Sequence, residues 1–292
     1  MNLQKVLFLG GSGSYASVQV RCVDIASRLG CDYLIGGYNI QEIPDKYSAF
    51  VCIKPYLLPG LPEALASRGK IIWDIIDEPP LPKYVSVYIA STKIAKDLFS
   101  HIGRIVIIPH HHCNFGGKPN PSNLRKPAWI GSSHWLPTLA GFKYDVYPVQ
   151  GMTRQDVVKA HRRIGIGLNF RNKNAFFEQA WPSLEQLART VKERRRMERN
   201  MYNFHLAVNS GIKLINCIGF GTPSISGDEP AYHEIGEECT IFTNTRHCAR
   251  WVKELKNDAD LYLDLRKRCL RKASKYHIDV IVEKYRTLLK SL

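Results

Sequence analysis

The stretch Gly211-Ile-Lys-Leu-Ile-Asn-Cys-Ile-Gly-Phe-Gly-Thr-Pro-Ser-Ile-Ser226 predicts an amphipathic helix, a glycine turn and a short buried strand. Asn209 or Ser210 can cap this helix, so that its unpaired N–H groups and the positive end of its dipole face an anion. Lys213 lies in the first turn, where a cation opposes the helix dipole and is better explained by a negatively charged neighbour. The stretch therefore predicts a phosphate site. The alternative is an ordinary helix–strand unit with a surface lysine.

The length and charge of the chain narrow its class. Its 292 residues, 45% of them hydrophobic, suffice for about two globular domains. The 41 Lys and Arg residues outnumber the 26 Asp and Glu residues, which gives a net charge of +15. This excess favours an anionic partner, which could be nucleic acid, an anionic membrane surface or a phosphorylated substrate.

The sequence shows neither a signal peptide nor an apolar run of about 20 residues, the length that a membrane span requires. We therefore expect a cytoplasmic, soluble protein, peripheral to a membrane or associated with DNA at most. The eight cysteines form no CxxC pair and lie mostly in apolar surroundings. They predict buried free thiols, with neither disulfides nor a zinc site.

Short apolar runs alternate with helical patterns throughout the chain, which predicts α/β domains with parallel sheets. The strands expected in the first half are 5–9, 31–35, 49–53, 70–76, 85–90 and 104–108, with a helix over 15–29. The prolines and glycines of 116–127 predict a linker. The strands expected after it are 128–131, 145–148, 164–168, 223–226 and 238–242, followed by two charged helices within 248–292 that break near Tyr276–Asp279.

The opening stretch resembles the donor-binding signature of GT-B glycosyltransferases, "K-L-x-E-x-x-A-x-G-x-P", at Lys213, Leu214, Gly221 and Pro223. Asn216 replaces the glutamate that binds ribose in the family, and an amide can still hydrogen-bond a diol. The resemblance implies two Rossmann-like domains facing a cleft, with the C-terminal helix crossing back. The domains would be residues 1–115 for the acceptor and 128–272 for the nucleotide-sugar donor, and the last helix, 273–292, would pack on the first domain.

The resemblance also assigns residues to the donor. Arg171, which follows the 164–168 strand, could pair with the diphosphate, although a solvent-exposed loop arginine is an equal alternative. The expected donor-binding residues are Arg171, Lys213, Asn216, Gly221, Thr222, Pro223 and Ser224.

In the first domain, the loop of Gly11, Ser12, Gly13 and Ser14 follows the first strand, and the resemblance implies that it faces the acceptor. It lacks the third glycine of a dinucleotide fingerprint, so an NAD-dependent activity is disfavoured.

Three residues at strand ends are candidates for catalysis. Asp77 or Glu78 could act as a general base, the alternative being acidic caps of the following turn. His110, in the run His110-His-His112, could touch the sugar or the acceptor, the alternative being a polar hinge residue. Adjacent histidines on an extended chain point to opposite faces, so we expect no metal there.

A basic segment over 184–203 includes Arg194 and Arg195, which we assign to acceptor binding. Such a run is usually a solvated helix face, but with nearby aromatic residues it also suits nucleic acid or an anionic lipid surface.

The predicted function is a metal-independent glycosyltransferase, with hexosyl transfer expected, that uses a nucleotide sugar, foremost a UDP-sugar, as co-substrate and holds no tightly bound cofactor. The anionic acceptor is an envelope glycan or lipid intermediate. One alternative is a phage-type DNA glycosyltransferase that acts on hydroxymethylated pyrimidines, and another is a non-catalytic nucleotide- or nucleic-acid-binding module.

Overall fold

The computed structural model describes residues 2–13, 16–55, 60–76, 83–172, 209 and 211–292. They form two compact units. Unit 1 contains the described residues up to His111, residue 209 and Ile278–Leu292. Unit 2 contains the described residues from His112 to 172 and Gly211–His277.

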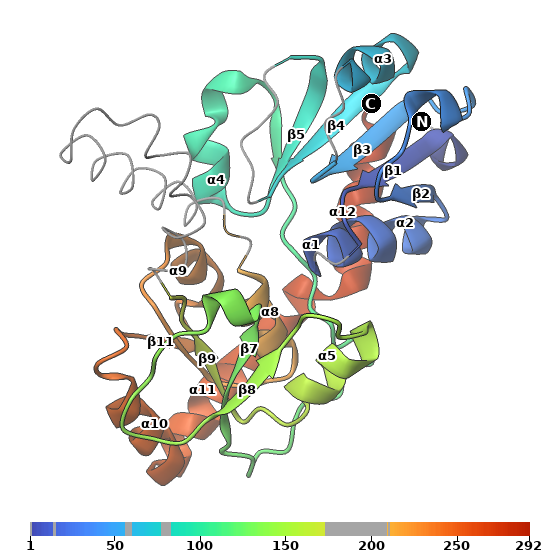
Figure 1. Cartoon of the computed structure of the whole chain (residues 1–292). Helices are drawn as coiled ribbons and strands as arrows, with labels where there is room; N and C mark the ends of the chain where they lie inside the picture. Colours follow the sequence, from blue (N-terminus) through green and yellow to red (C-terminus); the bar gives the residue numbers. More distant parts are fainter. Residues whose placement is uncertain (1, 14–15, 56–59, 77–82, 173–208, 210) are drawn as a thin grey trace, which may run out of the picture. The chain divides into compact units, whose positions relative to one another are not determined.

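Unit 2 is a parallel five-stranded sheet in the order β11-β10-β9-β7-β8 (Figure 1). The chain runs from β7 to β8 on one side, then returns to place β9 on the other side of β7, so the strand order reverses between β7 and β9. Ligands of open parallel sheets bind at such a reversal, outside the carboxyl ends of the strands. The strands are β7 (Pro127–Gly131), β8 (Asp145–Pro148), β9 (Ile166–Asn169), β10 (Ser224–Ser226) and β11 (Thr240–Phe242).

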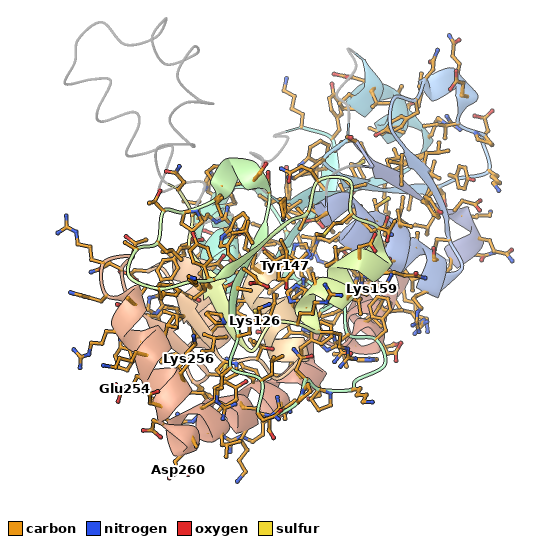
Figure 2. The ribbon with its side chains drawn as sticks, turned by 60° about the horizontal axis from the view of Figure 1, so that its bottom comes forward. Lys126, Tyr147, Lys159, Glu254, Lys256 and Asp260 are labelled. Atoms are coloured by element: carbon orange, nitrogen blue, oxygen red, sulfur yellow. The ribbon has the colours of Figure 1, made fainter. Side chains whose placement is uncertain are left out.

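Helices cover both faces of this sheet, and successive side chains of β7 point to opposite faces and pack against different helices. Trp129 packs with residues of α10 and α11, whereas Ala128 and Ile130 pack against α5. Figure 2 shows unit 2 from below, with α10 and α5 on separate sides. The helices are α5 (Arg154–His161), α8 (Ile212–Gly219), α9 (Pro230–Gly236), α10 (Cys248–Asn257) and α11 (Ala259–Ala273).

Unit 1 is a parallel six-stranded sheet in the order β2-β1-β3-β4-β5-β6. Its strands are β1 (Val6–Gly10), β2 (Asp32–Ile35), β3 (Ala49–Ile53), β4 (Lys70–Ile75), β5 (Val85–Ala90) and β6 (Ile105–Ile107). Its helices are α1 (Ala16–Val18), a π-helical turn (Gln19–Val23), α2 (Asp24–Leu29), α3 (Leu61–Arg68), α4 (Lys93–Leu98) and α12 (Ile278–Lys290). Short 3₁₀ turns are Leu3–Lys5, Ile40–Glu42 and Ser100–Ile102 in unit 1, and Ser133–Trp135 and Ser274–Tyr276 in unit 2.

The last helix, α12, completes the core of unit 1. Its buried Tyr285 lies 6.1 Å from Phe8 of β1, measured between ring centroids, and Ile281 and Leu289 are also buried. Helix α12 therefore belongs to unit 1, which agrees with the predicted return of the C-terminal helix to the first domain.

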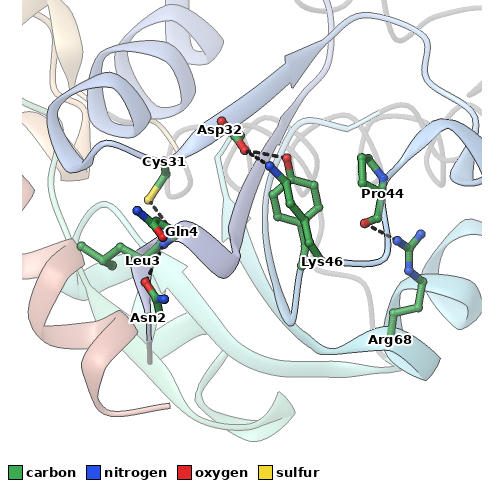
Figure 3. Close-up of polar contacts among 9 residues, drawn as sticks. Asn2, Leu3, Gln4, Cys31, Asp32, Pro44, Lys46 and Arg68 are labelled. Carbon is green, nitrogen blue, oxygen red and sulfur yellow. Dashed lines mark hydrogen bonds and ion pairs between the residues drawn. The ribbon is translucent and has the colours of Figure 1, made fainter.

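Polar contacts secure the outer loops of unit 1 (Figure 3). The Asp32 carboxylate accepts hydrogen bonds from Lys46 Nζ at 2.9 Å and from Tyr47 Oη at 2.7 Å. Arg68 donates to the carbonyl oxygen of Pro44, and Cys31 Sγ lies 3.4 Å from the carbonyl oxygen of Leu3. These contacts anchor connecting loops and involve none of the predicted site residues.

Each described strand begins and ends within about two residues of its predicted position. The C-terminal region differs from the prediction, because it contains three helices and not two. Asp258 separates α10 from α11, and its Oδ1 caps α11 by accepting a hydrogen bond from Leu261 N at 2.8 Å. All eight cysteines are buried free thiols, which confirms the prediction of burial. None of the described helices has the length and hydrophobicity needed to cross a membrane.

Candidate functional site

The candidate site of unit 2 lies at the carboxyl ends of β7 and β9, where the strand order reverses. Helix α8 begins at this edge and runs back toward the amino ends of the strands. Gly211 is its N-cap residue, in the left-handed region at φ 61°. The N-cap position therefore falls on Gly211, where the left-handed conformation favours glycine, and not on Asn209 or Ser210 as predicted. The first turn carries Lys213, as predicted.

The ammonium group of Lys213 is buried, although the stem of this side chain is partly exposed. Nζ lies 4.5 Å from the ring centroid of Trp129, so the indole face provides a cation–π contact. A Cβ atom added to Gly131 would come within 2.7 Å of Nζ, so the close approach of the lysine to β7 requires this glycine. Nζ has no hydrogen-bond partner among the residues that the structure describes.

Two further charged side chains lie beside this lysine. Arg171, which follows β9, places Nε 3.3 Å from Oε1 of Glu229, and both side chains are largely buried. Burial lowers the pKa of Lys213 to about 7, the charge of Arg171 adds to this effect, and the charge of Glu229 opposes it. One carboxylate thus faces two cations, so the cluster has the electrostatics of a site for an anion.

The glycine turn lies at the other end of α8, at the amino end of β10, and is closed to ligands. Thr222 and Ser224 are almost fully buried, and Thr222 Oγ1 donates to the carbonyl oxygen of Ile164 at 3.3 Å. The carbonyl oxygen of Gly221 accepts a hydrogen bond from Arg266 Nη1 at 2.9 Å. The prediction that Gly221, Thr222, Pro223 and Ser224 bind the same ligand as Lys213 is wrong, because the length of α8 separates them from it. Their role is to pack the helix–strand turn.

Asn216 lies one turn after Lys213 and is mostly buried. Its Oδ1 accepts a hydrogen bond from the backbone N–H of Cys113 at 2.8 Å. The oxygen proposed to bind ribose therefore already has a structural partner within unit 2.

No protein-family profile and no curated protein sequence matches this chain. Solved structures do match it. The chain is similar to Anabaena Alr3699/HepE in complex with UDP and glucose, with a TM-score of 0.57, 12% identity, and coverage of 99% of this chain and 100% of that one. It is also similar to a glycosyltransferase from Rickettsia africae ESF-5, with a TM-score of 0.50, 9% identity, and coverage of 100% and 99%.

The fold is that of the GT-B glycosyltransferases. At these identities the likeness establishes the two-domain α/β architecture, as predicted from the sequence. Lys213, Arg171 and Glu229 belong to the second Rossmann-like unit of this GT-B fold, where the resemblance placed the donor.

The first unit of the GT-B fold contains the loop predicted to face the acceptor. Position 11 requires a glycine, because a Cβ atom there would lie 2.0 Å from the carbonyl oxygen of Lys54, directly after β3. A Cβ atom on Gly13 would lie 3.3 Å from Ile35 Cγ2. The assignment of Gly11, Ser12 and Gly13 to acceptor binding stays a prediction.

The three adjacent histidines have three different surroundings. His110 is completely buried in unit 1, and neither ring nitrogen has a hydrogen-bond partner among the described residues. Burial, followed by the charge of Arg21, holds its pKa well below the usual value, so its imidazole is neutral. His111 Nε2 lies 2.9 Å from the carbonyl oxygen of Val20, whereas His112 lies in unit 2, 5.5 Å from His277 between ring centroids. Among the described residues, no three His, Cys, Asp or Glu side chains are grouped to hold a metal ion.

Five predicted site residues lie outside the described part of the chain: Ser14, Asp77, Glu78, Arg194 and Arg195. The structure also identifies Trp129, Gly131 and Glu229, which were not predicted. Glu229 carried a usable signal, since it follows a buried strand of the second domain as Arg171 does. No sequence pattern could have indicated Trp129 or Gly131, because their roles depend on Lys213, which belongs to a helix distant in sequence.

Proposed function

We propose that this protein is a glycosyltransferase that transfers a sugar from a nucleotide-sugar donor, foremost a UDP-sugar, to an acceptor hydroxyl. The observation that carries the proposal is the buried ammonium of Lys213, which lies at the strand-order reversal of a GT-B fold without a partner among the described residues. The similar Anabaena structure is a complex with UDP and glucose, which supports a uridine nucleotide as the first candidate.

The proposed role of Lys213 is to neutralise the diphosphate. Cleavage of the bond between the sugar and the nucleotide leaves negative charge on the diphosphate, and a fixed cation in a site of low dielectric constant stabilises this charge. Arg171 is already within ion-pair distance of Glu229, so Lys213 is the cation with an unmatched charge. A bound diphosphate would supply the missing negative partner and raise the pKa of the ammonium.

The proposed roles in unit 1 remain those expected from the sequence. His110 is neutral, so its imidazole could accept or donate a hydrogen bond to the sugar or the acceptor. Asp77 or Glu78 remains the proposed general base, and the loop of Gly11 to Ser14 the proposed acceptor loop. The net charge of +15 supports an anionic acceptor, either an envelope glycan or lipid intermediate or DNA with hydroxymethylated pyrimidines.

The donor is tested by thermal unfolding of the full chain with UDP, GDP, ADP, CDP and dTDP and their sugar conjugates. A ligand of the folded state raises the melting temperature, and we expect the largest rise with UDP or a UDP-sugar. Lys213→Ala should abolish this rise, whereas Lys159→Ala, which removes an exposed lysine of α5, should preserve it. If no nucleotide changes the melting temperature, the proposed donor site is wrong.

Catalysis is tested separately by release of free UDP from the preferred UDP-sugar over time. We expect slow hydrolysis by the wild type and none by Lys213→Ala. Binding without any hydrolysis, and without transfer to glycan, lipid or hydroxymethylated DNA acceptors, would support the non-catalytic nucleotide-binding alternative.

A further inference from the structure

A cavity of about 600 Å³ in unit 2 opens at the amino ends of β7 and β8. Its walls are Arg125 and Lys126 before β7, the segment 142–145 that leads into β8, and Lys256 in the last turn of α10. Lys126 and Lys256 lie on the same side of the unit in Figure 2. Lys213 lies at the opposite edge of the sheet, separated by the length of a strand, roughly 15 Å.

The charges of this cavity are unbalanced. Four cationic residues line it, together with a single carboxylate, Asp145. Lys126 Nζ lies 2.6 Å from Asp145 Oδ2, and Tyr147 Oη donates to the same oxygen at 2.8 Å. These hydrogen bonds, that of Lys126 first, lower the pKa of Asp145, so this carboxylate is ionised and already paired.

The other three cations, Arg125, Lys143 and Lys256, have no carboxylate partner within the described part of the chain. The guanidinium of Arg125 stacks on Tyr262, 3.2 Å from the ring centroid, and donates to the carbonyl oxygen of Ser122. Its position is therefore fixed by packing. Like charges that converge on one cavity repel each other unless an anion lies between them.

The remaining wall is rigid. Phe142 and Tyr144 pack against the core beneath α10, with 5.5 Å between their ring centroids. Tyr144 Oη donates to the carbonyl oxygen of Pro137 at 3.1 Å. A preformed apolar floor with cations at its rim lowers the cost of ordering a ligand.

We propose that this cavity binds a small ligand with two or more phosphate groups, at a site separate from Lys213. Its volume lies within the range of about 300–1,000 Å³ that is typical of small-molecule sites. Its concave shape suits a compact polyanion better than a flat membrane surface or a rigid duplex. Because the two sites lie at opposite edges of one sheet, both can be occupied at once. The proposal does not depend on the glycosyltransferase activity.

Isothermal titration with inorganic tripolyphosphate tests this site. All variants carry Lys213→Met, so that the probe cannot bind at the other edge. The cavity variant adds Lys143→Gln and Lys256→Gln, and the control adds Lys159→Gln and Lys253→Gln, which remove the same charge from exposed positions outside the cavity. We expect the cavity variant to weaken binding by about tenfold or more, and the control by less than about twofold.

Three results would overturn the proposal. The first is equal weakening of probe binding in the cavity variant and the control, which indicates diffuse surface charge. The second is the absence of any heat of binding at about 10 mM probe. The third is displacement of the probe by a short DNA duplex whose own binding requires Lys143 and Lys256. The four substituted lysines are exposed, and matching thermal unfolding curves would show that every variant is folded.

Discussion

The two units each bury a cation near the carboxyl edge of a parallel sheet, but in opposite electrostatic situations. In unit 1, Arg21 pairs through Nε with Asp74 of β4 and donates from Nη1 to the carbonyl oxygen of Ile108 at 2.9 Å. Burial alone would lower the pKa of Arg21, but the charge of Asp74, the charge of Tyr285 and the hydrogen bond to Asp74 together outweigh it, and the pKa is raised. In unit 2, Lys213 has no such partner among the described residues, and its pKa is lowered.

Under the proposed function, Arg21 is a structural charge and Lys213 is a charge that binds the ligand. A buried cation with a carboxylate and a carbonyl partner stabilises its own unit once both partners are present. A buried cation without a partner costs free energy in the unliganded protein, and a bound anion recovers that cost. The comparison therefore makes opposite predictions for the removal of each cation.

The largest effect is expected when the matched pair is broken. Arg21→Leu leaves the Asp74 carboxylate buried and uncompensated, which should lower the free energy of unfolding by about 3–5 kcal/mol. The measurement is urea denaturation of the full chain. Arg21→Leu with Asp74→Leu should recover much of the loss, and a single variant as stable as the wild type would contradict the structural role.

Removal of the unmatched cation should raise the free energy of unfolding, which is the opposite effect. Lys213→Met keeps an unbranched apolar side chain against Trp129 and removes the buried charge, so the unliganded protein should gain about 1–4 kcal/mol in its free energy of unfolding. The same variant should lose affinity for UDP in calorimetry. Lys159→Met, at an exposed site, should change stability by no more than about 0.5 kcal/mol. A destabilised Lys213→Met variant would mean that the lysine has a structural role after all.

Displacing the unmatched cation without removing it is a finer test. In Gly131→Ala the new methyl group would meet Lys213 Nζ at 2.7 Å and the Trp129 ring at 2.9 Å. The ring is fixed in the core, so we expect a loss of about 1–3 kcal/mol in stability from overpacking. The affinity for UDP should also fall because the ammonium is moved. Unchanged UDP affinity would place the diphosphate away from this lysine.

The pH dependence is gradual, so its effect per pH unit is the smallest of these effects and requires the most careful control. The pKa of Lys213 is about 7 in the folded protein against an ordinary value of 10.5. The unfolded chain therefore binds more protons between these values, so this residue makes stability rise with pH from about 7 to 10.5, by at most about 1.4 kcal/mol per unit.

Diphosphate affinity should fall over the same interval, because the anion binds the protonated amine. Calorimetry at pH 7, 8 and 9, in buffers of different ionisation enthalpy, should show proton uptake on UDP binding in the wild type and not in Lys213→Met. Equal proton uptake in both proteins would assign the titration to another group.

The sequence predicts the strands well because each is a short apolar run between turn residues, and this pattern depends only on local burial. Lys213 was found by the same local reasoning, since a cation in a first helical turn requires an explanation. The role of Gly221 to Ser224 was mispredicted because adjacency in sequence was taken as adjacency in space, whereas α8 carries the chain to the opposite edge of the sheet. Trp129 reaches Lys213 only through the sheet order, which no local pattern encodes, whereas the place of Glu229 after a buried strand was a local signal. Asp258 was overlooked as a helix boundary, although its side chain caps α11.

Helix α12 also has a consequence for biosynthesis. The strands of unit 1 are translated before unit 2, but Tyr285, Ile281 and Leu289, which fill the core of unit 1, are translated after it. Until then Phe8 lacks its aromatic neighbour, and Asp74 lacks the Tyr285 hydroxyl that lies 3.4 Å from its Oδ2. Unit 1 therefore cannot complete its core until unit 2 has been translated, and the nascent chain keeps an apolar surface uncovered throughout the synthesis of unit 2.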